Sequence, residues 1–163
     1  KQPRGVISIV RIERCTDDVE QLRPLVESWK LQAGRTDGIV LDVEHFIAAL
    51  AVWLKSGFPA TVLVLKSDQG RPLGFMGLCV FESPLGPQFI AQEHFWYVLP
   101  EHRSMAVSGM FLDAAYAWAK EHGAAAFSLT ASRMANTEME RVCRMYERWG
   151  FRHYESSFIK EVA

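Results

Sequence analysis

The stretch of residues 95–112, FWYVLPEHRSMAVSGMFL, constrains the fold more than any other part of the chain. Its aromatic start is typical of a β-strand, a short polar turn follows, and the Ala-rich sequence beyond Gly109 predicts a helix. Arg103 opens the turn, and small residues follow at Ala106, Ser108 and Gly109. Such a turn can aim several backbone N–H groups and the positive end of a helix dipole at a phosphate. The same spacing also fits an ordinary strand–loop–helix connection. The rest of the chain is needed to distinguish a phosphate-binding turn from such a connection.

Composition favours one well-packed domain. The chain has 163 residues, of which 49% are hydrophobic, and we expect a single domain over residues 1–163. A net charge of −1 gives no electrostatic case for nucleic-acid binding. No apolar run reaches the roughly 18 residues that cross a membrane. Cys15, Cys79 and Cys143 are odd in number and lie in apolar contexts, which predicts reduced thiols in a cytoplasmic protein. The chain lacks Cys-x-x-Cys and His-x-x-x-His patterns, so we expect no metal site.

Hydrophobic periodicity and turn residues divide the chain into alternating strands and helices. We expect strands at 6–12, 61–66, 73–82, 89–99, 125–130 and 151–162, and helices from Asp17 to Gly34 and at 43–56, 109–122 and 136–149. Tight turns join the second, third and fourth of these strands, so they are antiparallel. The helix that follows makes the fourth and fifth strands a parallel pair. The predicted fold class is α/β (α+β), a mixed, mostly antiparallel central sheet flanked by helices on both faces.

Two short motifs frame the second half of the chain. The segment VLPEHR ends at Arg103 just before the turn, and YERWGF occupies residues 146–151. Together with the order of the elements, these motifs resemble the GNAT superfamily of acyl-CoA-dependent N-acetyltransferases over nearly the whole chain. The family favours Arg/Gln-x-x-Gly-x-Gly/Ala in the turn, and here Ala106 and Ser108 replace the glycines. Both are small enough to let a phosphate approach the backbone.

The resemblance implies an activity and a place for its cosubstrate. An acetyl group would pass from acetyl-CoA to an amine of a small molecule or peptide by direct attack, without a metal, in a protein that commonly forms homodimers. The strands at 89–99 and 125–130 would splay apart at their C-terminal ends and admit the pantetheine arm. The implied cofactor-binding residues are Tyr97 and Val98 on the strand, and Arg103, Ser104, Met105, Ala106, Val107 and Ser108 around the pyrophosphate.

Two side chains are candidates for the proton transfers of that reaction. Tyr146 would donate to the departing thiolate, although a Tyr on an apolar helix face is also common as core packing. Glu93 would be the general base, because burial in an aromatic strand raises the pKa of a carboxyl group, although a solvated strand residue fits the sequence equally well. His94 is expected on the opposite face and is a weaker candidate for the base. Cys143 fits an inert buried thiol better than a nucleophile.

A second interpretation belongs to a different class of protein. A GNAT-like domain without catalysis could serve as a binding or structural module, and Ala106 and Ser108 are the features that favour it. Binding of acetyl-CoA distinguishes the two, because a ligand at about 100 times its Kd adds roughly 2.7 kcal/mol to stability.

Overall fold

The computed structural model describes residues 10–33, 35–36, 39–132 and 138–158. The strands are β1 (Val10–Cys15), β2 (Arg35–Thr36), β3 (Ile39–Val40), β4 (Ala60–Ser67), β5 (Pro72–Glu82), β6 (Phe89–Val98) and β7 (Ala124–Ser128). The helices are α1 (Arg23–Ala33), α2 (Val43–Lys55), α3 (Met105–Glu121) and α4 (Met139–Arg148), with short 3₁₀ turns η1 (Val19–Leu22) and η2 (Pro100–His102). Within this part of the chain, every helix is too short or too polar to cross a membrane.

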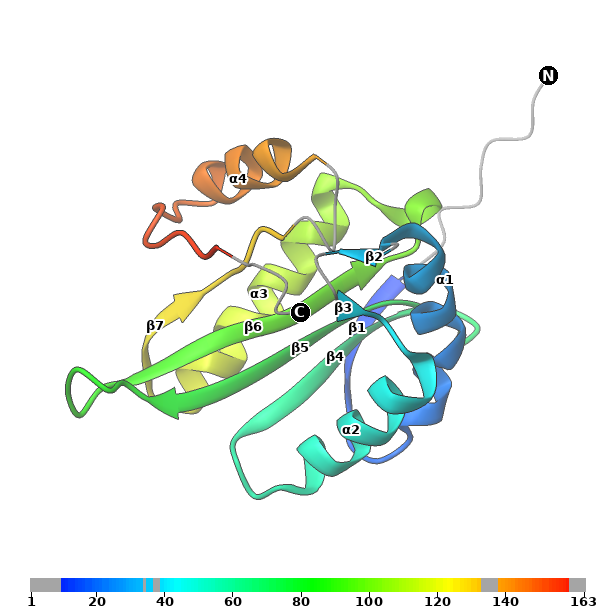
Figure 1. The fold of residues 1–163 in the computed structure, drawn as a ribbon, viewed down its shortest axis with the longest axis horizontal. Helices are drawn as coiled ribbons and strands as arrows, with labels where there is room; N and C mark the ends of the chain where they lie inside the picture. Colours follow the sequence, from blue (N-terminus) through cyan, green and yellow to red (C-terminus); the bar gives the residue numbers. More distant parts are fainter. Residues whose placement is uncertain (1–9, 34, 37–38, 133–137, 159–163) are drawn as a thin grey trace.

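Five strands form the central sheet in the order β1-β4-β5-β6-β7 (Figure 1). The first three pairings are antiparallel, and β6 pairs with β7 in parallel. β2 and β3 form a separate small hairpin between α1 and α2, which the sequence analysis did not anticipate. The predicted fold class, a mixed and mostly antiparallel sheet with helices on both faces, is confirmed.

Each face of the sheet carries its own hydrophobic core. Along β4, Val62 and Val64 pack under α1 and α2, whereas Leu63 and Leu65 pack on the side of α3. All four side chains are buried, because helices cover both faces of the sheet. Such a strand has a nearly continuous apolar sequence, and this explains why β4 could be recognised from sequence although its hydrophobic residues do not alternate with polar ones.

A bulge in β6 changes which face its side chains take. Gly77 pairs with Phe95 and the next residue of β5 pairs with Glu93, so His94 is the extra residue between them. Ala91 belongs to the core on the α3 side, and Glu93 lies two residues beyond it on the same face. After the bulge, Phe95 packs with the α1–α2 core and Trp96 with the α3 core. The extra residue therefore puts Glu93 and Trp96 on the same face of the sheet.

The predicted helix start at Asp17 is wrong. The sequence Asp17-x-x-Glu20 has the spacing of a capping box, but η1 begins at Val19 and its N-cap makes no side-chain hydrogen bond. Glu20 instead forms an ion pair with Arg23, at 2.8 Å. The α-helix begins at Arg23, which puts Pro24 in its first turn, where the missing N–H costs nothing.

β1 ends at Cys15, three residues beyond the predicted end at Ile12, and residues 6–9 of that predicted strand lie outside the described residues. The remaining differences lie in the second half of the chain. α3 begins at Met105, four residues before the predicted start, because the Ser104 hydroxyl caps it by accepting from Val107 N at 3.2 Å. The final strand predicted over 151–162 is absent from the described residues up to 158, and its last residues lie outside them. Tyr154 and Phe158 are 84% and 95% exposed. Exposed and buried side chains do not alternate along their segment, as they would in a strand with one buried face. A strand without a ladder partner is not stable.

We predict that Gly77→Ala destabilises the fold by about 1–3 kcal/mol, because a methyl group at this position would overlap the Phe95 ring. Urea unfolding of the parent and the variant measures the loss. The matched control is the same change in a Phe95→Leu background, where the tip of the ring is gone and the cost of Gly77→Ala should shrink. Equal costs in both backgrounds would contradict the assignment of the strain to this ring contact.

Candidate active site

β6 and β7 separate at the carboxyl end of β7. Their ladder runs from Phe89–Ala124 to Gln92–Ser128 and goes no further. β6 continues for residues 93–98, still paired with β5 on its other edge as far as Gly74–Val98. Backbone groups on the β7 side of this stretch have thus lost their strand partner. The splayed pair implied by the sequence is present in the structure.

The backbone of Thr130 connects the two predicted catalytic residues at this point. Thr130 N–H donates to Glu93 Oε2 at 3.0 Å. The Tyr146 hydroxyl donates to Thr130 O at 3.3 Å, which is long for a bond between two oxygens. A strand residue and a residue of α4, 53 positions apart in sequence, therefore meet where the sheet opens.

Among the described residues, Glu93 is the acidic residue whose side chain is buried, with 4% of its surface exposed. Burial raises its pKa from 4.5 to about 7, and the N–H of Thr130 opposes this only in part. The elevated pKa expected from the sequence is confirmed. A carboxyl group with this pKa changes protonation state near neutral pH, as a general base must.

Tyr146 lies on the buried side of α4 and is 9% exposed. Burial raises the pKa of its phenol, and the charges of Glu93 and Cys143 raise it further. Its ring stacks on Trp96, with centroids 6.5 Å apart and planes 7° apart, and also contacts Phe151. The hydroxyl therefore keeps its proton at neutral pH and is held in a fixed position as a donor.

His94 lies on the other face of the sheet, as the sequence analysis expected. Its Nε2 is 2.9 Å from Cys79 Sγ, and the ring packs edge-on against Trp53 of α2. Burial lowers the pKa of His94 and raises that of the Cys79 thiol, so both groups favour their neutral forms. These contacts direct His94 away from Tyr146.

The predicted phosphate turn is the cap and first turn of α3. Residues 103–106 are exposed, and the first N–H groups of a helix have no acceptor within it. Val107 N is bonded to the Ser104 hydroxyl and Ser108 N to Ser104 O, so these two N–H groups are already engaged. The groups left for an anion are the N–H groups of Ser104, Met105 and Ala106, at the positive end of the helix dipole.

Arg103 and Tyr97 have side chains that face α1. The guanidinium donates to Val98 O and to Gln32 Oε1, each at 2.8 Å, and lies 5.5 Å from the centroid of the Tyr97 ring. The Tyr97 hydroxyl is 2.8 Å from Ser28 Oγ and accepts from Gln32 Nε2 at 2.6 Å. These contacts tie the end of β6 to α1, and they already engage the carbonyl oxygen of Val98.

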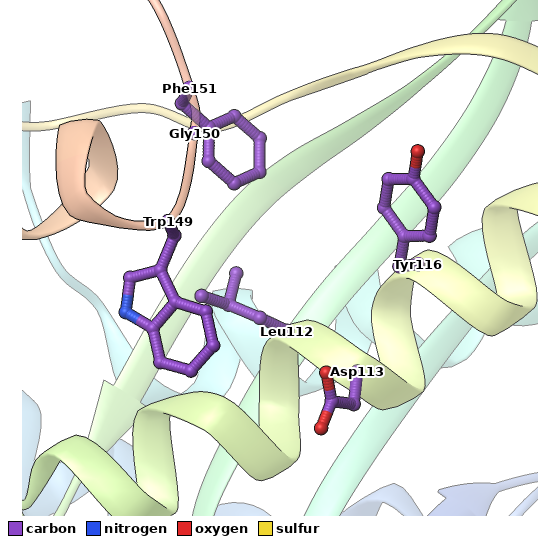
Figure 2. A pocket seen from close by; sticks show the side chains of 6 residues that line it. All are labelled: Leu112, Asp113, Tyr116, Trp149, Gly150 and Phe151. Atoms are coloured by element: carbon purple, nitrogen blue, oxygen red, sulfur yellow. The ribbon is translucent and has the colours of Figure 1, made fainter.

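A cavity of about 340 Å³ lies beside the site, between α3 and the residues that follow α4 (Figure 2). Leu112, Asp113 and Tyr116 line it from α3, and Trp149 and Phe151 from the other side. A methyl group on Gly109 would come within 2.8 Å of the Trp149 ring. Gly109 is thus small because α4 packs against it, and not because it forms part of a phosphate turn.

The sequence analysis missed two residues of this site. Thr130 was placed only as the end of a predicted strand, and a backbone role leaves no signature in residue type. Trp96 was assigned to a strand without a role, because its contact with Tyr146 depends on the bulge. Among the described residues, no cluster of His, Cys, Asp and Glu side chains is suited to hold a metal ion.

Comparison with known families identifies the class of protein. A family model described as the acetyltransferase (GNAT) family matches residues 27–151, and the chain belongs to this family. The match contains β6, α3, β7 and α4, and therefore the whole of the site described above. No curated protein matches the chain at a significant level.

Solved structures have the same fold. A GCN5-related N-acetyltransferase from Ralstonia eutropha JMP134 is 26% identical, with a TM-score of 0.70 over 94% of this chain and 99% of that one. A ribosomal-protein-alanine N-acetyltransferase from Brucella melitensis biovar Abortus 2308 is 19% identical, with a TM-score of 0.71 over 95% and 100%. A predicted acetyltransferase from Clostridium acetobutylicum, solved with acetyl-CoA, is 15% identical, with a TM-score of 0.68 over 92% and 94%.

We predict that Glu93→Gln removes a pH-dependent loss of stability. Because the folded pKa of Glu93 is about 7 and the ordinary value is 4.5, the folded state binds the proton more tightly. Stability therefore falls as pH rises from about 4.5 to about 7, by about 3 kcal/mol in total. Glutamine cannot ionise, and its amide oxygen can still accept from Thr130 N–H.

The measurement is urea unfolding of parent and variant between pH 4.5 and 8. The advantage of Glu93→Gln over the parent should grow with pH through this window. Glu82→Gln changes an exposed carboxylate and should keep the parent's pH dependence. A constant difference between Glu93→Gln and the parent would show that Glu93 is not the buried acid described here.

Proposed function

We propose that this protein transfers an acetyl group from acetyl-CoA to an amine of a small molecule or peptide, by direct attack of the amine. Membership of the GNAT family supports acyl transfer to an amine. The observation that carries the proposal is the meeting of Glu93 and Tyr146 at the backbone of Thr130, where β6 and β7 part. A base and an acid on either side of one opening suit an acyl transfer in which both partners exchange protons.

Glu93 would serve as the base. An amine attacks only in its neutral form, and the proton that it loses needs an acceptor. A carboxyl group with a pKa of about 7 is substantially ionised at neutral pH and is basic enough to take that proton. The bond from Thr130 N–H holds its Oε2 in place.

Tyr146 would serve as the donor to the leaving sulfur. Its raised pKa keeps the hydroxyl protonated, so it would stabilise the departing thiolate by donating a hydrogen bond to the sulfur. The hydroxyl has only one proton, and at present that proton is directed at Thr130 O. Since this bond is long, its exchange for a bond to sulfur costs little.

Acetyl-CoA would supply the activated acyl group, and the structure has groups that fit its parts. The N–H groups of Ser104, Met105 and Ala106 suit the pyrophosphate, and the Ser104 cap fixes the turn that presents them. The opening beside residues 93–98 of β6 suits the pantetheine arm, because backbone groups there have lost their strand partner. Structures with similar folds were solved with acetyl-CoA and with CoA, which supports the choice of cosubstrate.

A GNAT-like domain that binds without catalysis is the second candidate. The observations that favour it are Ala106 and Ser108 in the turn, together with the internal bonds that already engage Val107 N and Ser108 N. The two candidates differ in turnover and not in fold. The homodimer and the cytoplasmic location expected from the sequence stay predictions.

We predict that Ala106→Glu abolishes binding of acetyl-CoA, because it places a carboxylate beside the pyrophosphate and fills the approach to the α3 N-terminus. Titration calorimetry on the parent and the variant tests this. Ala49→Glu introduces the same charge on an exposed alanine of α2 and should bind like the parent. If the parent shows no binding at millimolar acetyl-CoA, the proposed function is wrong, and if Ala106→Glu binds normally, the pyrophosphate lies elsewhere.

We predict that Tyr146→Phe lowers turnover by about 10²–10⁴-fold while the ring keeps its contacts with Trp96 and Phe151. Stability should fall by only about 1 kcal/mol, the usual net value of one hydrogen bond. Thiol release from acetyl-CoA in the presence of a panel of amines measures the rate, and thermal melting of the same samples controls for folding. Full turnover in a folded variant would reduce Tyr146 to a packing role, and binding without turnover in the parent would favour the second candidate.

A further inference from the structure

Two tryptophan side chains bury a hydrogen-bond donor that has no acceptor among the described residues. They are Trp29 in α1 and Trp96 in β6, and in both the atom is the indole Nε1. A buried N–H without a partner is destabilising, and such groups are rare in native proteins. Each one therefore requires an explanation, and the two lie in different surroundings.

Trp29 is enclosed by other aromatic rings on the α1–α2 face of the sheet. Its ring centroid lies 5.8 Å from that of Phe46, 6.1 Å from Phe75 and 6.0 Å from Tyr97, and the residue is 8% exposed. This surrounding is core packing, on the face of the sheet opposite to Trp96. The unsatisfied N–H of Trp29 is therefore explained by aromatic packing in the core, which buries it at some loss of stability.

Trp96 lies at the opening itself. It belongs to residues 93–98 of β6, which extend past the last rung shared with β7. Its ring stacks on Tyr146 of α4 and packs on Phe111 of α3, with centroids 5.6 Å apart in the second contact. The bulge at His94 puts it on the same face as Glu93. The donor without an acceptor thus belongs to a ring that stacks on Tyr146 and shares a face of the sheet with Glu93.

We infer that Trp96 is a positioning residue, whose indole N–H donates to a carbonyl oxygen of the acyl-pantetheine arm. This inference rests on the proposed function. An indole N–H is a donor only, so its partner must be an acceptor, and the arm has amide carbonyls and, when acylated, a thioester carbonyl. The bound ligand would satisfy a donor that the folded chain leaves open. The stack with Tyr146 would fix that donor relative to the phenol that faces the leaving sulfur.

Indole resonances in protein labelled with ¹⁵N-tryptophan test this directly. The Trp96 and Trp29 signals are assigned with Trp96→Phe and Trp29→Phe, and CoA, acetyl-CoA and adenosine 3′,5′-bisphosphate are titrated in turn. We expect CoA and acetyl-CoA to shift the Trp96 N–H downfield and to slow its exchange with solvent, while Trp29 stays unchanged. The bisphosphate lacks the arm and should leave Trp96 unchanged. A shift with acetyl-CoA alone would assign the thioester carbonyl, and a shift with both would assign an amide.

Affinity gives a second readout with a matched control. Trp96→Phe keeps a ring against Tyr146 but loses the donor, and should weaken acetyl-CoA binding about three- to tenfold, the usual net effect of one hydrogen bond. Trp29→Phe makes the same chemical change on the other face and should bind acetyl-CoA like the parent. Melting of both variants confirms that they fold.

The outcomes separate the two proposals. If acetyl-CoA binds but Trp96 shifts neither with acetyl-CoA nor with CoA, or shifts equally with the bisphosphate, the inference about Trp96 is wrong and the proposed function stands. Equal affinities for Trp96→Phe and the parent would likewise overturn it. If no CoA binds by heat or by any resonance, both the inference and the proposed function are wrong.

Discussion

The site depends on one irregularity in the sheet, the extra residue His94 in β6. Without it, Glu93 would share a face with Phe95 and Tyr97 and would lie under α1 and α2. With it, Glu93 and Trp96 share the α3 face of the sheet, where Tyr146 stacks on Trp96 and is linked to Glu93 through the backbone of Thr130. Gly77 makes the bulge fit, because the ring of Phe95 lies over the space that a side chain there would occupy. The packing of Phe95 over Gly77, between β5 and β6, thus helps to bring together Glu93 and Tyr146, which lie far apart in the chain.

The parting of β6 and β7 has a cost that the site partly offsets. Backbone groups that leave a ladder need other partners, and Glu93 supplies one by accepting from Thr130 N–H. The same burial that makes this bond useful raises the pKa of Glu93 to about 7. One carboxyl group therefore both stabilises this backbone and is the proposed base. The buried indole N–H of Trp96 likewise lowers stability, because it has no acceptor among the described residues, while it leaves a donor for the proposed ligand.

Most of the fold could be predicted from the sequence, because strong local signals mark its elements. β4, β5, β6 and α2 lie within a residue or two of their predicted limits, since turn residues and apolar periodicity agree there. The exceptions have physical causes. α3 starts earlier because Ser104 caps it, and the segment after Phe151 forms no strand within the described residues because it has no ladder partner there. A cap depends on side-chain geometry and a strand on its neighbour, and neither can be read from residue types alone.

The sequence by itself determined the order of most strands and helices and the parallel pair, and its motifs, through the resemblance to the GNAT family, pointed to the two candidate residues Glu93 and Tyr146. These follow from local periodicity, from chain connectivity and from motifs, all of which are properties of short segments. Only the tertiary structure decided that both residues meet at the backbone of Thr130, that Arg103 and Tyr97 turn toward α1, and that the N–H of Trp96 lies buried at the opening. The physical reason is that these features depend on the register of β5 and β6 and on where β7 ends. Register is fixed by packing between segments far apart in the chain, which no single segment encodes.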